Sequence, residues 1–166
     1  NFKLNYSDIT QYTILALLPN YYDNKDSSLI YMIEKLIKLS KSKESGFFLD
    51  DYINLSKKII ELDTKKERKI ILIGVPYALL DMIDFNQFQL NNTIIMETGG
   101  MKGRRKEMVR TELHEKLKRG FGVSKIHSEY GMTELISQAY SKGDGIFKTP
   151  SWMKVIIRDI NDAQNL

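Results

Sequence analysis

Residues 69–76 of this chain read Lys-Ile-Ile-Leu-Ile-Gly-Val-Pro, and this stretch decides the fold class. Its apolar residues follow one another without polar alternation, which is typical of a β-strand that is covered on both faces. Pro76 then fits the first turn of a helix, where its missing N–H costs little. A buried strand that leads directly into a helix is the repeating unit of a parallel sheet, so we expect an α/β fold.

The same succession of strand and helix continues on both sides of this stretch. The other expected strands are residues 12–18, 92–96, 123–127 and 153–157. The spacing of apolar residues predicts three helices, over about 28–40, about 51–62 and 76–83. It predicts a fourth helix that begins at about Arg104 and is ended by Gly120 and Gly122. We therefore predict a three-layer α/β/α fold with a mainly parallel sheet, formed by residues 1–166 as a single unit.

Composition excludes several classes of protein. The chain has 166 residues, of which 42% are hydrophobic and 28% are charged, as in a globular domain. It contains no cysteine, which excludes disulfides, thiolate metal sites and a cysteine nucleophile within these residues. No apolar run approaches the roughly 18 residues of a membrane span. We expect a cytoplasmic protein and, because the chain does not begin with methionine, a piece of a longer one.

Positive charge is concentrated in the last third of the chain. The net charge is +4, and residues 101–166 hold 13 Lys and Arg against 8 Asp and Glu. Eight of these basic residues lie between Lys102 and Arg119. They form either a solvated helix face or a surface for a polyanion. Acidic residues interrupt the segment and no nucleic-acid motif accompanies it, so we expect no nucleic-acid partner.

Polar clusters follow three of the expected strands, at residues 97–100, 129–134 and 158–159. Ligands of open parallel sheets bind beyond the carboxyl ends of the strands, so we expect the ligand site there. The turn at Gly99 and Gly100 either brings backbone N–H groups close to a ligand or is a sharp turn without one. No phosphate-loop signature occurs in the chain.

The block Tyr130-Gly131-Met132-Thr133-Glu134 also has two interpretations. In the first, the aromatic ring covers a base, the Thr133 hydroxyl donates to a phosphate oxygen, and the Glu134 carboxylate holds a hard cation such as Mg²⁺. In the second, the block is a helix start, with Thr133 as its cap and Glu134 in the first turn, where carboxylates are favoured. The chemistry of the residues alone leaves both interpretations open.

Two motifs carry a resemblance to a known family. Tyr-Gly-x-Thr-Glu, here residues 130–134, is the signature of the adenylate-forming superfamily. The Thr98-Gly99-Gly100 turn, and residues 97–141 as a whole, resemble the acyl-protein synthetases of bacterial bioluminescence and their relatives. Phenylacetate–CoA ligases and acyl-CoA synthetases are similar at greater distance. The resemblance implies that the chain is the middle part of the large domain of such an enzyme.

The resemblance also implies roles for particular residues. The nucleotide, ATP or AMP, would be bound by Gly99, Gly100, Tyr130, Gly131, Thr133 and Asp159. Thr133 and Glu134 would be the catalytic residues: Thr133 would contact the α-phosphate, and Glu134 would be the Mg²⁺ ligand. Asp159 would hold the ribose hydroxyls.

The implied function is that of an acyl-activating ligase or acyltransferase. Such an enzyme forms an acyl-adenylate from ATP and a carboxylic acid, with fatty acids among the candidates, and passes the acyl group to a thiol or amine. The chain lacks the family's phosphate loop, its small C-terminal domain and its transfer cysteine, so we expect the segment itself to be inactive. The alternative is a non-catalytic nucleotide-binding or scaffold module. A truncated sheet would expose apolar surface, so we also expect self-association.

The two histidines have competing interpretations. His127 is either a packed residue at the end of a strand, which we favour, or a contact to the base of the nucleotide. His114 lies among charges on its expected helix, and we expect it to face solvent.

Overall fold

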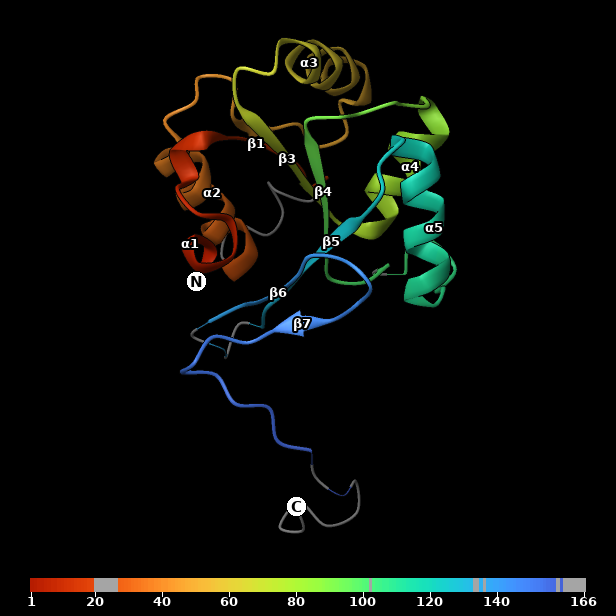
Figure 1. The fold of residues 1–166 in the computed structure, drawn as a ribbon. Helices are drawn as coiled ribbons and strands as arrows, with labels where there is room; N and C mark the ends of the chain where they lie inside the picture. Colours follow the sequence, from red (N-terminus) through yellow and green to blue (C-terminus); the bar gives the residue numbers. More distant parts are fainter. Residues whose placement is uncertain (20–26, 102, 133–134, 136, 158, 160–166) are drawn as a thin grey trace.

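The central feature of the computed structural model is a seven-stranded sheet, in the order β2-β1-β3-β4-β5-β6-β7 (Figure 1). The structure describes residues 1–19, 27–101, 103–132, 135, 137–157 and 159. The strands are β1 (Tyr12–Leu17), β2 (Gly46–Phe47), β3 (Lys69–Gly74), β4 (Thr93–Thr98), β5 (Ile126–Tyr130), β6 (Ala139–Ser141) and β7 (Phe147–Lys148). The first five are parallel, and β6 and β7 continue the sheet antiparallel.

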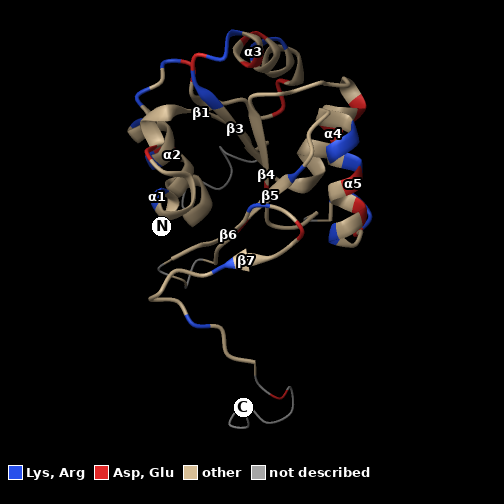
Figure 2. Ribbon diagram, in the orientation of Figure 1, with Lys and Arg blue, Asp and Glu red and all other residues tan. Residues whose placement is uncertain are grey.

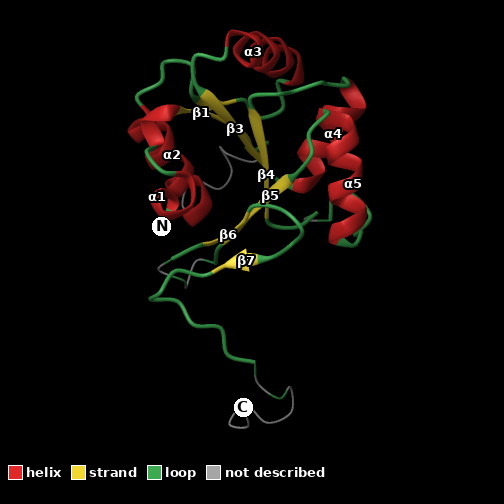
Figure 3. Ribbon diagram, viewed as in Figure 1, coloured by secondary structure: helices red, strands yellow, loops and turns green. Residues whose placement is uncertain are grey.

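Helices cover both faces of this sheet (Figure 3). They are α1 (Phe2–Tyr6), the 3₁₀ turn η1 (Ile9–Gln11), α2 (Ser28–Ser40), α3 (Tyr52–Lys65), α4 (Pro76–Phe85) and α5 (Arg110–Phe121). The chain steps from β1 to β2 in one direction and then from β2 through β3 and β4 to β5 in the other. Because such crossovers are right-handed, α2 covers one face and α3, α4 and α5 the other. The predicted three-layer α/β/α fold with a mainly parallel sheet is confirmed.

The stretch that predicted the fold lies in the middle of the sheet. β3 pairs with β1 along its whole length, from Tyr12 opposite Lys69 to Leu17 opposite Gly74. Every residue of β1 is buried, and in β3 only Lys69 is exposed. Strands buried on both faces must be apolar throughout, which is why the sequence of each shows no alternation.

An aromatic cluster at the N-terminus was not predicted. Tyr6 of α1 packs edge-on against Tyr12 and Tyr140, and its hydroxyl lies 2.9 Å from Nδ1 of His127. Burial lowers the pKa of His127 to about 4, so the ring is neutral at pH 7. His127 is therefore a packed residue, as we favoured, although it is the second residue of β5 rather than its end.

The helix expected from about Arg104 begins six residues later, at Arg110. The intervening segment crosses α4, where the Arg105 guanidinium pairs with the carboxylates of Asp81 and Asp84. These ion pairs, together with the left-handed backbone of Gly103 (φ 69°), hold the segment in a non-helical path. Val109, expected in the buried stripe of the helix, is instead its exposed N-cap residue.

The prediction of a strand over residues 153–157 is also wrong. These residues have no regular secondary structure, and Val155 and Ile157 are exposed. Figure 1 shows this part of the chain leading away from the sheet. A β-branched run becomes a strand only where a neighbouring strand offers hydrogen bonds, and residues 153–157 pair with no strand in the described part of the chain. The last strands are instead the short β6 and β7.

Gly120 has a different role from the one expected. It lies inside α5, which ends at Phe121 and is capped by the left-handed Gly122 (φ 67°). A Cβ atom at Gly120 would lie 2.5 Å from Cβ of Ile83, so the glycine lets α5 approach α4 closely.

We predict that Gly120→Ala destabilises the protein even though alanine is the better helix former. Helix propensity favours alanine by about 1 kcal/mol, but overpacking in a core costs about 1–3 kcal/mol. Urea unfolding should show a net loss of up to about 2 kcal/mol. In an Ile83→Ala background the same substitution should cost less, because the obstructing side chain is gone. A stabilised single variant would show that the two helices do not need this close approach.

Candidate functional site

A pocket of about 190 Å³ lies at the carboxyl ends of β4 and β5, where the polar clusters of the sequence were expected to bind a ligand. The loop after β5 and the start of α2 form its other walls. Its lining residues are Ser27, Ser28, Leu29, Met32, Thr98, Gly99, Glu129, Gly131, Met132, Leu135 and Gln138. The pocket is thus lined by residues of both motifs that carry the family resemblance. Thr98 and Glu129, at the ends of the two strands, are 31 positions apart in the sequence.

Strand register places the polar side chains of this site. Thr98 of β4 lies opposite Glu129 of β5, so both side chains point to the face that α2 covers. The Thr98 hydroxyl donates a 2.5 Å hydrogen bond to a carboxylate oxygen of Glu129. Both residues are buried, and both line the pocket. The bond holds one oxygen of Glu129.

Burial raises the pKa of Glu129 above its usual range, and the nearby carboxylate of Glu97 raises it further. The hydrogen bond from Thr98 acts in the opposite direction but does not cancel these effects. A buried carboxyl group with a raised pKa beside a pocket is a feature that functional sites share.

A second polar cluster lies on the opposite face of the sheet. Glu97 precedes Thr98 and therefore points toward α5, where its carboxylate lies 3.5 Å from Nε2 of His114 and 3.7 Å from the guanidinium of Arg110. His114 is buried, which corrects the expectation that it faces solvent. The helix turns it inward because the buried Glu97 needs hydrogen-bond partners there. Arg110 also stacks on the ring of Phe147 at 4.9 Å.

Only part of the predicted nucleotide site comes together. Gly99, with a left-handed backbone (φ 77°), and Gly131 both line the pocket, whereas Gly100 is exposed and outside its lining. The ring of Tyr130 packs edge-on against Phe147, 6.1 Å away, and is outside the lining as well. Asp159 is an exposed residue without regular secondary structure and is also outside the lining.

The two predicted catalytic residues, Thr133 and Glu134, lie outside the described residues. The structure therefore leaves both interpretations of them as predictions. In the described part of the chain, no group of three or more His, Asp and Glu side chains is placed to hold a metal ion.

The start of α2 was not predicted to belong to the site. Ser27 is its N-cap residue and makes no side-chain capping bond, and Ser27, Leu29 and Met32 all line the pocket. The signal was present in the sequence: α2 follows β1, and a helix that follows a parallel strand starts at the same edge of the sheet.

Several basic residues of the segment around α5 are paired within the protein. Arg105 is bound to two aspartates of α4, Lys116 lies 2.8 Å from Glu112, and Lys118 lies 2.9 Å from Glu115. Such neighbouring pairs are typical of a solvated helix face. None of the helices in the described part of the chain is long and apolar enough to cross a membrane.

Comparison with known proteins gave no match: no family model, no curated protein and no solved structure is similar to this chain.

We predict that Glu129→Gln changes how stability depends on pH. Because the pKa of Glu129 is raised, the folded state keeps this proton at pH values where the unfolded state has lost it. The ordinary pKa of a glutamate is about 4.5. Wild-type protein should therefore lose stability relative to Glu129→Gln as pH rises from this value through the raised pKa of Glu129. Chemical unfolding of both proteins between pH 4 and 8 measures this difference.

Glu115→Gln is the matched control, with the opposite sign. A hydrogen bond from Lys118 lowers the pKa of Glu115, so wild-type protein should gain stability relative to this variant as pH rises toward 4.5. If the difference in unfolding free energy between wild type and Glu129→Gln does not vary with pH, Glu129 does not keep its proton in the folded state as predicted.

Proposed function

We propose that this chain is the nucleotide-binding part of an acyl-activating enzyme of the adenylate-forming kind. The observation that carries the proposal is the pocket at the carboxyl ends of β4 and β5, which Gly99 and Gly131 both line. These glycines belong to the two motifs that resemble the superfamily. In parallel α/β sheets this edge is the usual place for a nucleotide.

The walls of the pocket suit a nucleotide in two respects. Gly99 and Gly131 carry no side chains, so a planar base could approach their backbone closely. The start of α2 also lines the pocket, and the N–H groups of a helix N-terminus favour anions such as phosphate. The buried Glu129, which lines the pocket as well, is a hydrogen-bonding group for the base or the ribose.

In the proposed reaction a carboxylate oxygen attacks the α-phosphorus of ATP, so that the acid becomes bonded to AMP and pyrophosphate leaves. A carboxylate oxygen is a poor leaving group and AMP is a better one, so adenylation prepares the acyl group for transfer to a thiol or amine. The protein must hold two anions together in line, which calls for fixed hydrogen-bond donors and positive charge. Thr133 would donate to the α-phosphate. Glu134 would hold Mg²⁺, whose preferred ligands are carboxylate and phosphate oxygens. Dependence on ATP favours the cytoplasm.

Two glycine substitutions test the location of the nucleotide. A Cβ atom at Gly131 would lie 2.7 Å from a carboxylate oxygen of Glu129 in the pocket, whereas one at Gly100 would meet nothing within 4 Å. Titration with AMP and with a non-hydrolysable acyl-adenylate analogue should therefore show weaker binding to Gly131→Ala and nearly unchanged binding to Gly100→Ala. Equal affinity of all three proteins, or no binding to wild type at any concentration, would contradict the proposed site.

Substitutions of Thr133 and Glu134 test the reaction itself. ATP–pyrophosphate exchange should be measured with a panel of carboxylic acids, using the protein that contains this segment. Loss of one preorganised electrostatic contact commonly costs ~10²–10³ in rate, so Glu134→Gln and Thr133→Val should slow exchange by about that factor. If Thr133 is instead a helix cap, Thr133→Val should cost roughly 1 kcal/mol of stability and leave the rate of the folded fraction unchanged.

The same assays separate the proposal from its alternatives. Nucleotide binding without exchange for any acid would indicate the non-catalytic module. Wild-type exchange and unchanged Mg²⁺ dependence in Glu134→Gln would remove the catalytic assignment. A tight, sequence-selective complex with DNA at moderate salt would contradict the ligase proposal.

A further inference from the structure

A second pocket, of about 310 Å³, lies at the opposite edge of the sheet, where β1 and β3 begin. The loop between α2 and β2, the end of α3 and the start of β3 surround it. Its lining residues are Thr13, Lys41, Ser42, Lys43, Glu44, Leu62, Lys65, Glu67, Arg68 and Ile70.

The lining is rich in positive charge. Four of its residues are cationic and two are acidic, and Figure 2 shows Lys and Arg gathered where the end of α3 meets the start of β3. Glu44 is occupied by an ion pair with Lys58, which lies outside the pocket. In the part of the chain that the structure describes, neither Lys41 nor Lys43 forms an ion pair.

Helix ends explain some of these cations but not all of them. Lys41 caps the C-terminus of α2 and Lys65 is the last residue of α3, where positive charge favours the helix dipole. Lys43 and Arg68 lie beyond both helices. The helix dipoles therefore do not account for the exposed Lys43, and Arg68 is held by the carbonyl of Ser40.

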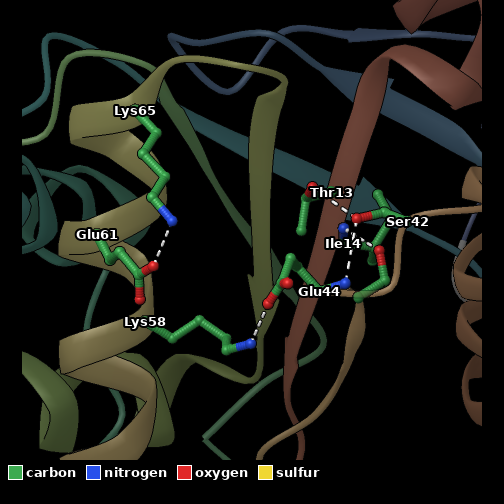
Figure 4. Close-up of polar contacts among 8 residues, drawn as sticks. Thr13, Ile14, Ser42, Glu44, Lys58, Glu61 and Lys65 are labelled. Carbon is green, nitrogen blue, oxygen red and sulfur yellow. Dashed lines mark hydrogen bonds and ion pairs between the residues drawn. The ribbon is translucent and has the colours of Figure 1, made fainter.

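Two hydroxyl groups at the wall of the pocket together have one hydrogen-bond donor that is not used within the described part of the protein. The Thr13 and Ser42 hydroxyl oxygens are 3.0 Å apart, and the backbone N–H of Glu44 donates to the Ser42 oxygen at 3.3 Å (Figure 4). The contact between the hydroxyls uses only one of their two protons. The other has no acceptor among the described residues and is available to an anion at the pocket.

A neighbouring network holds this loop in place before any ligand binds. The Ser45 hydroxyl accepts from the backbone N–H of Ile14 at 2.9 Å and contacts the Ser40 hydroxyl, also at 2.9 Å. Ser40 donates in turn to the carbonyl of Ile37. The Arg68 guanidinium donates to the carbonyl of Ser40 at 2.9 Å, which ties the start of β3 to the same loop. Fixed donors lose little entropy when they bind a ligand.

We propose that this basic pocket is a binding site for a phosphate group, separate from the nucleotide site. Lys43 and Lys41 supply charge, Arg68 has guanidinium N–H groups beyond the one that holds Ser40, and the Thr13–Ser42 pair supplies a hydroxyl donor. Combined cationic and hydroxyl donors are the usual recognition elements for phosphate oxygens. The pocket takes either inorganic phosphate or the phosphate end of a small phosphorylated molecule.

The experiment is an NMR titration of the ¹⁵N-labelled chain with inorganic phosphate and, separately, with glycerol 1-phosphate, at constant ionic strength. We expect saturable shifts of the backbone amides of residues 42–44 and of Arg68 with at least one of the two. Tighter binding of the ester would identify a phosphorylated metabolite as the ligand, and equal or tighter binding of inorganic phosphate would identify the free ion.

Lys43→Gln and Ser42→Ala are the test variants, and Lys57→Gln, on the exposed surface of α3 outside the pocket, is the matched control. Removal of one charge-assisted hydrogen bond should weaken phosphate binding by roughly tenfold in Lys43→Gln. The control should bind like wild type, and circular dichroism should show that all variants fold. The proposal would be overturned if the shifts do not saturate or if chloride reproduces them. It would also be overturned if the shifts are confined to Gly99 and Gly131, or if they are equal in Lys43→Gln and Lys57→Gln.

Discussion

Burial of the central parallel strands on both faces is the constraint on which the rest of this structure depends. β1 and β3 have almost no exposed surface, so helices must cover the sheet from both sides. Parallel strands can be connected only by crossovers, and right-handed crossovers place α2 on one face and α3, α4 and α5 on the other. The carboxyl ends of the five parallel strands, β1 to β5, then lie at one edge of the sheet and their amino ends at the opposite edge, which separates the two pockets.

Polar side chains at the carboxyl edge are buried on both faces of the sheet. Because side chains alternate along a strand, the neighbours Glu97 and Thr98 point to opposite faces. A buried carboxylate is costly unless it is hydrogen-bonded, and each face supplies its own partner. Thr98 binds Glu129 beneath α2, while His114 and Arg110 of α5 approach Glu97. Burial raises the pKa of Glu129, and the nearby carboxylate of Glu97 raises it further.

The amino edge is lined by several cations. Its loop lies at the amino ends of β1 and β3 and carries lysines, and the Ser45 hydroxyl anchors it to the backbone of β1. The length of the strands separates this basic pocket from the pocket at the carboxyl edge. A ligand at one edge would not compete with a ligand at the other, so the two proposals stand or fall independently.

The sequence by itself determined the class of fold and one side of the candidate site. Unbroken apolar runs such as residues 69–74 predict strands with two covered faces, because a polar side chain there would lose its hydration. The order of strands and helices then predicts the parallel sheet, and the position of Gly99 and Gly131 after strands predicts the edge at which they meet.

Only the tertiary structure decided which polar residues act together. The start of α5 depends on Arg105 binding to Asp81 and Asp84 of a different helix, and the inward turn of His114 depends on Glu97 in a neighbouring strand. Likewise, residues 153–157 have the β-branched composition of a strand but no strand beside them in the described part of the chain. Local sequence patterns report the propensity of one segment, whereas ion pairs, hydrogen bonds and strand pairing depend on partners that folding brings from elsewhere in the chain.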